Sequence, residues 1–334
     1  MITISIIIPV FKDLLALERC LDSILNQIAD TDQIILVDDG SPEKIHKSIE
    51  KNDRFSKIKN FKILKQTNLG SGIARNIGLK SAEKQYVWFV DADDFVSKDA
   101  LKTIKEKLEQ SEYDLLFFDY TVLNKKGRNL RKKLNIDLND KKKLYSLSHY
   151  PWNKVIKREL AIKVEYPKLN MRYQDQATIP KIIYFAKKIG YIEKSLYFYD
   201  FSHADSISKN YRKANDIYIA CDYLIDFFTK KNSFEELKII IFKVILFEKI
   251  LSISKMQVSL KDKFLQTKIL INYLNKAIPN WRKEDLIKKQ NMSQFSLVEK
   301  YKIKHFIARC VAFSPKTTLL FLITVQHFKK LIDL

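Results

Sequence analysis

Cysteine is scarce in this sequence. The 334 residues contain only three cysteines, Cys20, Cys221 and Cys310, which lie far apart and form no CxxC pair. This spacing indicates neither a disulfide framework nor a cysteine-based zinc site. A reducing, cytoplasmic setting fits the lack of both.

The sequence also lacks a long apolar run. A helix needs about 20 apolar residues to cross a bilayer, and the longest late candidate, TTLLFLITV at 317–325, is too short. The N-terminal stretch MITISIIIPV has no basic leader and no small-residue cleavage site, and it indicates a strand rather than a signal peptide. We therefore expect a cytoplasmic protein, either free or peripheral on the inner face of the cell membrane.

Two common nucleotide-binding motifs are missing. A dinucleotide-binding fold needs GxGxxG between its first strand and first helix, whereas that turn is PVFKD here, without glycine. A P-loop needs GxxxxGK[ST], and GIARNIGLKS at 72–81 departs from it by one position at the first glycine and at the lysine. Neither phosphate-binding loop is present.

Positive charge is abundant. The chain has 60 Lys and Arg against 39 Asp and Glu, a net charge of +21. Such a surplus suggests an anionic partner: a phosphorylated small molecule, anionic lipid or nucleic acid. Residues 211–334 hold 23 Lys and Arg against 11 Asp and Glu, more than half of the excess. No nucleic-acid-binding motif accompanies the charge, so we expect no nucleic acid partner.

The first 120 residues alternate between strand and helix patterns. Ile4–Val10 is a continuous apolar run, as expected for a strand buried on both faces, and further strands are predicted at 33–37, 61–65, 86–90 and 113–120. Apolar residues at helical spacing predict helices between them, the first with Asp13 as N-cap. This alternation is typical of an α/β domain with a mostly parallel sheet. From about residue 212 the pattern is helical, so we expect two domains, 1–211 and 212–334.

Acidic residues follow two of the predicted strands. Asp38 and Asp39 come after the second strand, and Asp91 and Asp93 after the fourth. In open α/β sheets, ligands bind beyond the carboxyl ends of the strands. Mg²⁺ and Mn²⁺ take hard oxygen ligands and bridge substrate phosphates, so these acids suggest a bound divalent cation. A capped, solvated turn is the alternative for DADDF taken alone, and turn hydrogen bonds are the role we expect for Asp38 and Asp94.

Four sequence blocks follow one another over about 90 residues: SIIIPVFK, ILVDDGSPE, NLGSGIARNIGL and VWFVDADDF. In this order they resemble the family 2 glycosyltransferases of the GT-A fold. PWNKVIKREL at 151–160, YQDQATIP at 173–180 and YFYDFSHADSIS at 197–208 look like later blocks of that family. The resemblance covers about residues 2–210. It implies a GT-A catalytic domain, Rossmann-like with a mostly parallel sheet, followed by an all-helical C-terminal region.

The resemblance implies an inverting transferase that uses a nucleotide-diphosphate sugar and a divalent metal, Mn²⁺ or Mg²⁺. Asp39 would accept a hydrogen bond from the base, which favours uracil because its ring N–H is a donor. Asp93 and His203 would bind the metal, a Lewis acid for the departing diphosphate. Asp175 would be the general base that takes the proton of the acceptor hydroxyl. The residues placed at the nucleotide sugar are Pro9, Phe11, Asp39, Arg75, Asp91 and Asp93.

One position departs from the family pattern. The family often has Glu-Asp where this chain has Gln174-Asp175. The aspartate keeps its place as base, whereas the missing acid would have oriented the acceptor or tuned the base. We place Trp152, Asn153 and Gln174 at the acceptor, where Trp152 either stacks on a sugar ring or belongs to the core.

These inferences predict a hexosyl- or N-acetylhexosaminyltransferase. It would move a sugar from a UDP-sugar to a hydroxyl of a glycan or lipid-linked oligosaccharide in surface polysaccharide synthesis. The alternative is a catalytically impaired GT-A-like binding or assembly protein, which Gln174 favours. The basic region 212–334 would pack on itself and on the catalytic domain, bind an anionic membrane surface, or form a homodimer.

Overall fold

The computed structural model describes residues 1–42, 45–56, 58–123, 129–138, 140–200, 213–241 and 258–283, and six residues between them: 244, 245, 249, 252, 253 and 256. The chain divides into two compact units. The first consists of Met1–Asn139 and Leu147–Ile207, and the second of Asp140–Ser146 and Ser208–Leu334.

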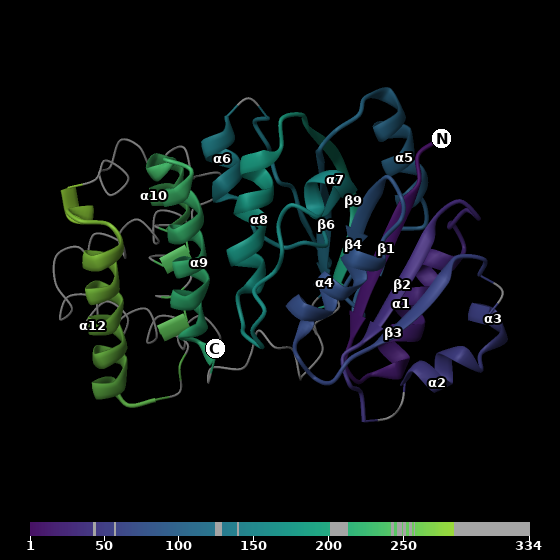
Figure 1. Ribbon diagram of the computed structural model, residues 1–334, viewed down its shortest axis with the longest axis horizontal. Helices are drawn as coiled ribbons and strands as arrows, with labels where there is room; N and C mark the ends of the chain where they lie inside the picture. Colours follow the sequence, from purple (N-terminus) through teal and green to yellow (C-terminus); the bar gives the residue numbers. More distant parts are fainter. Residues whose placement is uncertain are drawn as a thin grey trace. The chain divides into compact units, whose positions relative to one another are not determined.

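A single sheet forms the centre of the first unit (Figure 1). Its strands run in the order β3-β2-β1-β4-β8-β6-β9-β5, and β7 pairs with β6. Strands β1 to β4 are mutually parallel, as are β6 and β9, whereas β8 is antiparallel to both β4 and β6. The described strands are β1 (Ile4–Val10), β2 (Gln33–Asp38), β3 (Phe61–Lys65), β4 (Tyr86–Phe89), β5 (Phe95–Val96), β6 (Leu115–Leu123), β7 (Asn129–Lys132), β8 (Lys154–Lys157) and β9 (Ile189–Asp200). The predicted α/β class with a mostly parallel sheet is confirmed.

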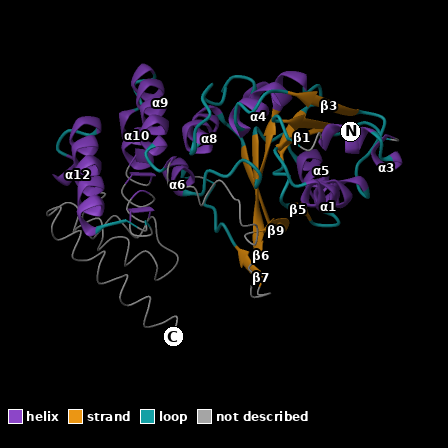
Figure 2. Ribbon diagram, turned by 90° about the horizontal axis from the view of Figure 1, so that it is seen from below, coloured by secondary structure: helices purple, strands orange, loops and turns teal. Residues whose placement is uncertain are grey.

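Helices cover both faces of this sheet (Figure 2). Because side chains alternate along a strand, Ile4, Ile6 and Ile8 of β1 share a core with α1 and α5, whereas Ile7 faces α4. Gly78 makes the α4 packing possible, since a Cβ at this position would lie 2.4 Å from Ile7 Cγ2. The described helices of this unit are α1 (Leu14–Leu25), α2 (Ile45–Glu50), α3 (Asp53–Ser56), α4 (Ser71–Ser81), α5 (Ala100–Gln110), α7 (Arg158–Ala161) and α8 (Gln174–Phe185).

The turn between β1 and α1 has an unusual backbone. Lys12 and Asp13 both have positive φ, 67° and 62°. The Asp13 carboxylate accepts a hydrogen bond from Ala16 N–H at 3.0 Å, which satisfies a backbone donor of the first turn. The predicted N-cap is confirmed, and α1 begins directly beyond the edge where β1 ends.

The described part of the second unit is helical. Its elements are α6 (Lys141–Ser146), α9 (Asp216–Lys230), α10 (Phe234–Ile241), α12 (Leu260–Ala277) and the 3-10 helix η4 (Trp281–Lys283). α9 buries one apolar face, formed by Ile217, Ala220, Cys221, Leu224 and Phe228. Within the described part of the chain, every helix is too short or too polar to span a bilayer. The predicted domain boundary at 211/212 and the tail beyond 283 lie outside the described residues.

Candidate active site

The candidate site lies at the edge where β1, β2 and β4 end. These strands are parallel, so their carboxyl ends meet at one edge. β6 and β9 run in the same direction as β4, because β4 and β6 are both antiparallel to β8. The residues just before β8, including Trp152 and Asn153, therefore lie at this edge as well. At the end of β1, Pro9 is buried and the Phe11 ring is 41% exposed.

Asp39 holds the loop after β3 in place. Its carboxylate accepts hydrogen bonds from Gln66 Nε2 at 2.6 Å, from Leu69 N–H at 2.8 Å and from Gly70 N–H at 3.0 Å. Its own N–H donates to the carbonyl of Val10 at 2.8 Å. Asp39 thus ties together the ends of β1, β2 and β3.

Asp38 has the turn role expected from the sequence. Its carboxylate accepts from Ser41 N–H and lies 2.8 Å from Nδ1 of His46. Burial would raise the pKa of Asp38, but the hydrogen bonds with Ser41 and His46 outweigh it and lower that pKa. The carboxylate is thus held charged by the loop itself.

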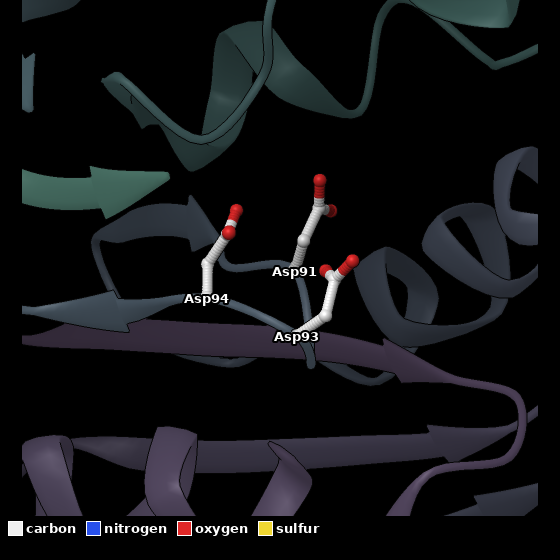
Figure 3. A group of neighbouring side chains, drawn as sticks. All are labelled: Asp91, Asp93 and Asp94. Carbon is white, nitrogen blue, oxygen red and sulfur yellow. The ribbon is translucent and has the colours of Figure 1, made fainter. Parts of the chain in front are cut away.

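Three aspartates project from the single turn that follows β4 (Figure 3). Asp91, Asp93 and Asp94 each bring a carboxylate oxygen within 4.8 Å of the others. Asp94 is fully buried and accepts from Tyr197 Oη–H and from Asp200 N–H, both at 2.7 Å. Burial, followed by the charges of Asp93 and Asp91, raises the pKa of Asp94 well above its usual value. Asp94 therefore holds the turn, as predicted, while Asp91 and Asp93 are partly exposed.

The donor set of this turn fits a hard divalent cation. Carboxylate oxygens are the ligands that Mg²⁺ and related ions take, with one or two from the protein. Asp91 and Asp93 can supply them, since Asp94 already uses its two oxygens for hydrogen bonds within the protein. His203, the other predicted metal ligand, lies outside the described residues.

Arg75 lies between two carboxylates that are distant in the sequence. Its Nη2 donates to Asp91 Oδ1 at 2.7 Å and its Nη1 to Asp175 Oδ1 at 3.2 Å. The Arg75 side chain is only 4% exposed. Burial alone would lower the pKa of its guanidinium, but the charges of Asp175 and Asp91 raise it. Its Nε–H is buried and has no hydrogen-bond partner among the described residues.

Asp175 is a carboxylate with an altered proton affinity. Burial raises the pKa of Asp175 to about 6, the charge of Asp91 adds to this rise, and the charges of Arg75 and Lys154 oppose it. Its side chain is nevertheless 29% exposed to solvent. A group with this pKa, at the first turn of α8 and open to solvent, is suited to general-base chemistry near neutral pH.

Gln174, next to Asp175, is tied to α4 through both ends of its amide. Its Oε1 accepts from Gly72 N–H at 3.0 Å, and its Nε2 donates to Ser71 Oγ. Gln174 therefore fixes the first turn of α8 against the first turn of α4. The same helix α4 carries Arg75. This position accounts for an amide where an acid is usual, and it gives Gln174 a positioning role toward Asp175.

Trp152 and Asn153, the other predicted acceptor residues, are buried. Trp152 is 2% exposed and stacks on Tyr197 with ring centroids 4.5 Å apart. The Asn153 Oδ1 accepts from Nζ of Lys154 at 2.6 Å. Both residues thus lie below the surface at this edge of the sheet.

Two site residues had no role in the sequence prediction. Tyr197 donates to Asp94 and accepts from Asp91 N–H at 3.1 Å. Lys154 is fully buried, and its charge acts on Asp175. Both belong to blocks that resemble the family, but their contacts depend on pairing with distant strands.

Comparisons with known proteins point to one family. Residues 5–184, more than half of the chain, match the family described as glycosyl transferase family 2. The glycosyltransferase GlyG of Streptococcus pneumoniae is 28% identical over 214 residues, which cover 59% of this chain and 70% of GlyG. The putative glycosyltransferase EpsH of Bacillus subtilis is 26% identical over 224 residues, which cover 63% of this chain and 64% of EpsH.

Solved structures show the same fold. Residues 1–349 of S. aureus TarS match with a TM-score of 0.70 at 18% identity, covering 98% of this chain and 92% of that one. The mannosyltransferase PcManGT from Pyrobaculum calidifontis matches with a TM-score of 0.53 at 14% identity, covering 99% and 87%. At such identities the likeness is one of fold, and it confirms the predicted GT-A fold. The match over residues 5–184 shows that the chain belongs to glycosyl transferase family 2, and the shared fold agrees with it.

Proposed function

We propose that this chain is an inverting, metal-dependent glycosyltransferase that moves a hexosyl or N-acetylhexosaminyl group from a UDP-sugar to an acceptor hydroxyl. One observation carries the proposal. The buried guanidinium of Arg75 holds Asp91 of the aspartate turn and Asp175 of α8 on its two sides. A donor-binding acid and a general base are thereby kept in one site.

The nucleotide would lie beside Phe11, Asp39 and Arg75. Asp39 Oδ2 accepts a hydrogen bond from Gly70 alone among the described residues, and a carboxylate oxygen can accept a second. A uracil N–H is a suitable donor for it. TarS has been crystallised with UDP-GlcNAc, which supports a UDP-sugar here, although PcManGT was solved with GDP-Man and Mn²⁺.

Asp93, with Asp91 beside it, would hold the divalent metal, Mn²⁺ or Mg²⁺, and His203 is proposed as a further ligand. The metal would supply Lewis-acid stabilisation of the departing diphosphate. Arg75, fixed between Asp91 and Asp175, would add a positive charge from the protein. Fixed charges of this kind stabilise a developing anion without reorganising.

Asp175 would take the proton of the acceptor hydroxyl. With a pKa of about 6 it is ionised at neutral pH, yet basic enough to accept a proton. Attack from the side opposite the diphosphate inverts the anomeric centre, through an oxocarbenium-like state as in glycoside hydrolysis. Gln174 would keep Asp175 in position through its bonds to Ser71 and Gly72.

The acceptor would be a glycan or a lipid-linked oligosaccharide of a surface polysaccharide, bound above Trp152 and Asn153. One relative supports this pathway class: the minor teichoic acid biosynthesis protein GgaB of Bacillus subtilis is 27% identical over 219 residues. The proposal includes a cytoplasmic location at the inner face of the membrane. It also includes contacts of the helical region with the membrane or with a second copy of the chain. A binding or assembly role without catalysis is less well supported, because Gln174 has a positioning role beside a retained base.

A donor screen tests the proposal. The full chain is incubated with UDP-, GDP- and dTDP-sugars, with and without Mn²⁺, and nucleotide release is measured with free and lipid-linked acceptors. We expect metal-dependent UDP release. Asp93→Ala should abolish metal-dependent UDP binding, whereas Asp175→Asn should retain binding and lose transfer.

Asp30→Asn is the matched control for these carboxylate variants. Asp30 is 82% exposed and precedes β2, at the opposite edge of the sheet, so this variant should behave as the wild type. No turnover with any donor, together with no UDP binding, would contradict the proposal.

A further inference from the structure

Four aromatic rings form a stack at the edge of the candidate site. Trp152 lies nearly parallel to Tyr197, at 4.5 Å and 8°, and to Tyr150, at 4.6 Å and 10°. Tyr199 stacks on Trp152 at 5.5 Å and on Tyr150 at 6.2 Å. Trp152 and Tyr197 are buried, whereas Tyr150 is 38% exposed. Tyr150 is therefore the most exposed of the four residues.

The segment that carries Tyr150 is anchored by a buried cation. Lys154 is fully buried, and its Nζ donates to the carbonyls of Tyr150 at 2.5 Å and Ser148 at 3.2 Å, and to Asn153 Oδ1 at 2.6 Å. The ammonium also lies 5.0 Å from the centre of the Phe117 ring. Three acceptors on one buried donor fix the backbone of residues 148–153, so Tyr150 is held in position before any ligand binds.

This segment is joined to both halves of the catalytic centre. His149, directly before Tyr150, is hydrogen-bonded to Gln176, directly after Asp175. Tyr197, another ring of the stack, donates to Asp94 of the aspartate turn. The stack is thus linked to the aspartate turn through Tyr197, and the residue before Tyr150 links the same segment to the first turn of α8.

We propose that Tyr150 is the platform on which the pyranose ring of the acceptor stacks. This inference rests on the proposed function, and it assigns a specificity role to a residue outside the predicted site. An aromatic face offers a flat apolar surface to the C–H face of a sugar, and its hydroxyl adds a polar contact. The rigid stack behind Tyr150 reduces the cost of ordering the ring on binding. Acceptors with one flat apolar ring face would be preferred over linear polyols.

Saturation-transfer NMR on the full chain, with UDP and Mg²⁺ present, tests this proposal. The probes are methyl β-D-glucopyranoside, methyl β-D-galactopyranoside and methyl N-acetyl-β-D-glucosaminide, with sorbitol as the acyclic control. We expect at least one glycoside to bind the wild type through its ring-face protons. Tyr150→Phe, which keeps the ring, should bind within about twofold of the wild type, and Tyr150→Ala should bind about tenfold more weakly.

Tyr150→Leu covers the case in which the alanine variant does not fold, because leucine still covers Trp152 but offers no flat ring. Equal glycoside binding by the wild type, Tyr150→Ala and Tyr150→Leu would overturn the proposal, and so would no glycoside binding by a wild type that binds UDP. UDP titration of the same samples reports on the donor site separately. Glycoside binding that depends on Tyr150 in a chain that binds no UDP would support the platform and contradict the proposed function.

Discussion

Gln174 accepts a hydrogen bond from the backbone N–H of Gly72 at 3.0 Å, which joins the first turn of α8 to the first turn of α4. The contact is close, since a Cβ on Gly72 would lie 2.7 Å from Gln174 Oε1. An amide suits the pair of partners, because its oxygen accepts from Gly72 and its nitrogen donates to Ser71 Oγ. The residue that departs from the usual acid thus positions Asp175, the proposed base, beside it.

Gln174→Glu should shift the pH dependence of transfer upward. The Ser71 hydroxyl can rotate and donate to the new carboxylate, so the link to α4 is kept. The added negative charge beside Asp175 favours the protonated form of that base and raises its pKa. The midpoint of UDP release against pH, with saturating acceptor, should therefore move from about 6 toward 7. Gln174→Ala serves as the comparison and should lower transfer at every pH. An unchanged midpoint in Gln174→Glu would show that the charge at position 174 does not affect the pKa of Asp175.

The contribution of Asp175 to the free energy of unfolding should be smaller at high pH than at low pH. Its pKa in the folded chain is about 6, above the usual 3.8, so the folded state binds this proton more tightly than the unfolded state. That contribution to stability is complete below the unfolded pKa and is lost as pH rises through about 6. Asp175→Asn should then be more stable than the wild type at pH 8 by about 1 kcal/mol, since partial exposure reduces the full effect of about two pKa units.

Thermal unfolding of both proteins at pH 5 and pH 8 measures this difference. The difference in stability between the wild type and Asp175→Asn should be smaller at pH 5, where the Asp175 carboxyl of the wild type is largely protonated. A wild type that is more stable than Asp175→Asn at pH 8 would show that the Arg75 contact outweighs the burial of the charge. The same series gives the pH profile of activity, which should rise to a plateau above pH 6 in the wild type.

Much of the fold could be predicted from local sequence. Ile4–Val10 is buried along its whole length, and such runs predict parallel strands because no other element buries both faces so completely. The aspartate turn was visible for the same reason: it follows the end of a strand whose residues are all buried. Local patterns therefore located the edge of the sheet and the acids on it.

Long-range contacts could not be predicted in the same way. Arg75 and Asp175 are 100 residues apart in the sequence, and only the packing of α8 against α4 brings them together. Asp39 supports a loop 30 residues further on, at Leu69, which nothing in its own block indicated. α6 belongs to the second unit although its sequence lies within the first. Each of these depends on which elements pack together rather than on local periodicity.

Arg75→Lys should impair both donor binding and transfer. A lysine has one ammonium on a flexible stem and cannot reproduce the planar fork that reaches Asp91 and Asp175 at once. We expect transfer to fall by at least about 100-fold and UDP binding by about tenfold, with a loss of about 2 kcal/mol in stability because a buried ion pair is broken. Isothermal titration with UDP and Mn²⁺, together with UDP release, separates the two effects.

Arg54→Lys is the matched control for Arg75→Lys. Arg54 is paired with Asp22, but its side chain is 58% exposed, and exposed pairs contribute little to stability. This variant should resemble the wild type in both assays. Full transfer activity in Arg75→Lys would show that the charge alone matters and that the two-carboxylate geometry does not.

Asp94→Asn and Asp93→Asn should have opposite effects. Asp94 accepts from two donors, Tyr197 Oη–H and Asp200 N–H, and an asparagine would turn its own NH₂ toward one of them. Leaving a buried donor unsatisfied costs about 1–3 kcal/mol, so the melting temperature of Asp94→Asn should fall while UDP still binds with metal. Asp93→Asn should change stability by less than about 0.5 kcal/mol and lose metal-dependent UDP binding. If Asp94→Asn is as stable as the wild type but no longer binds UDP with Mn²⁺, the roles given to the two residues are wrong. Asp94 rather than Asp93 would then be the metal ligand.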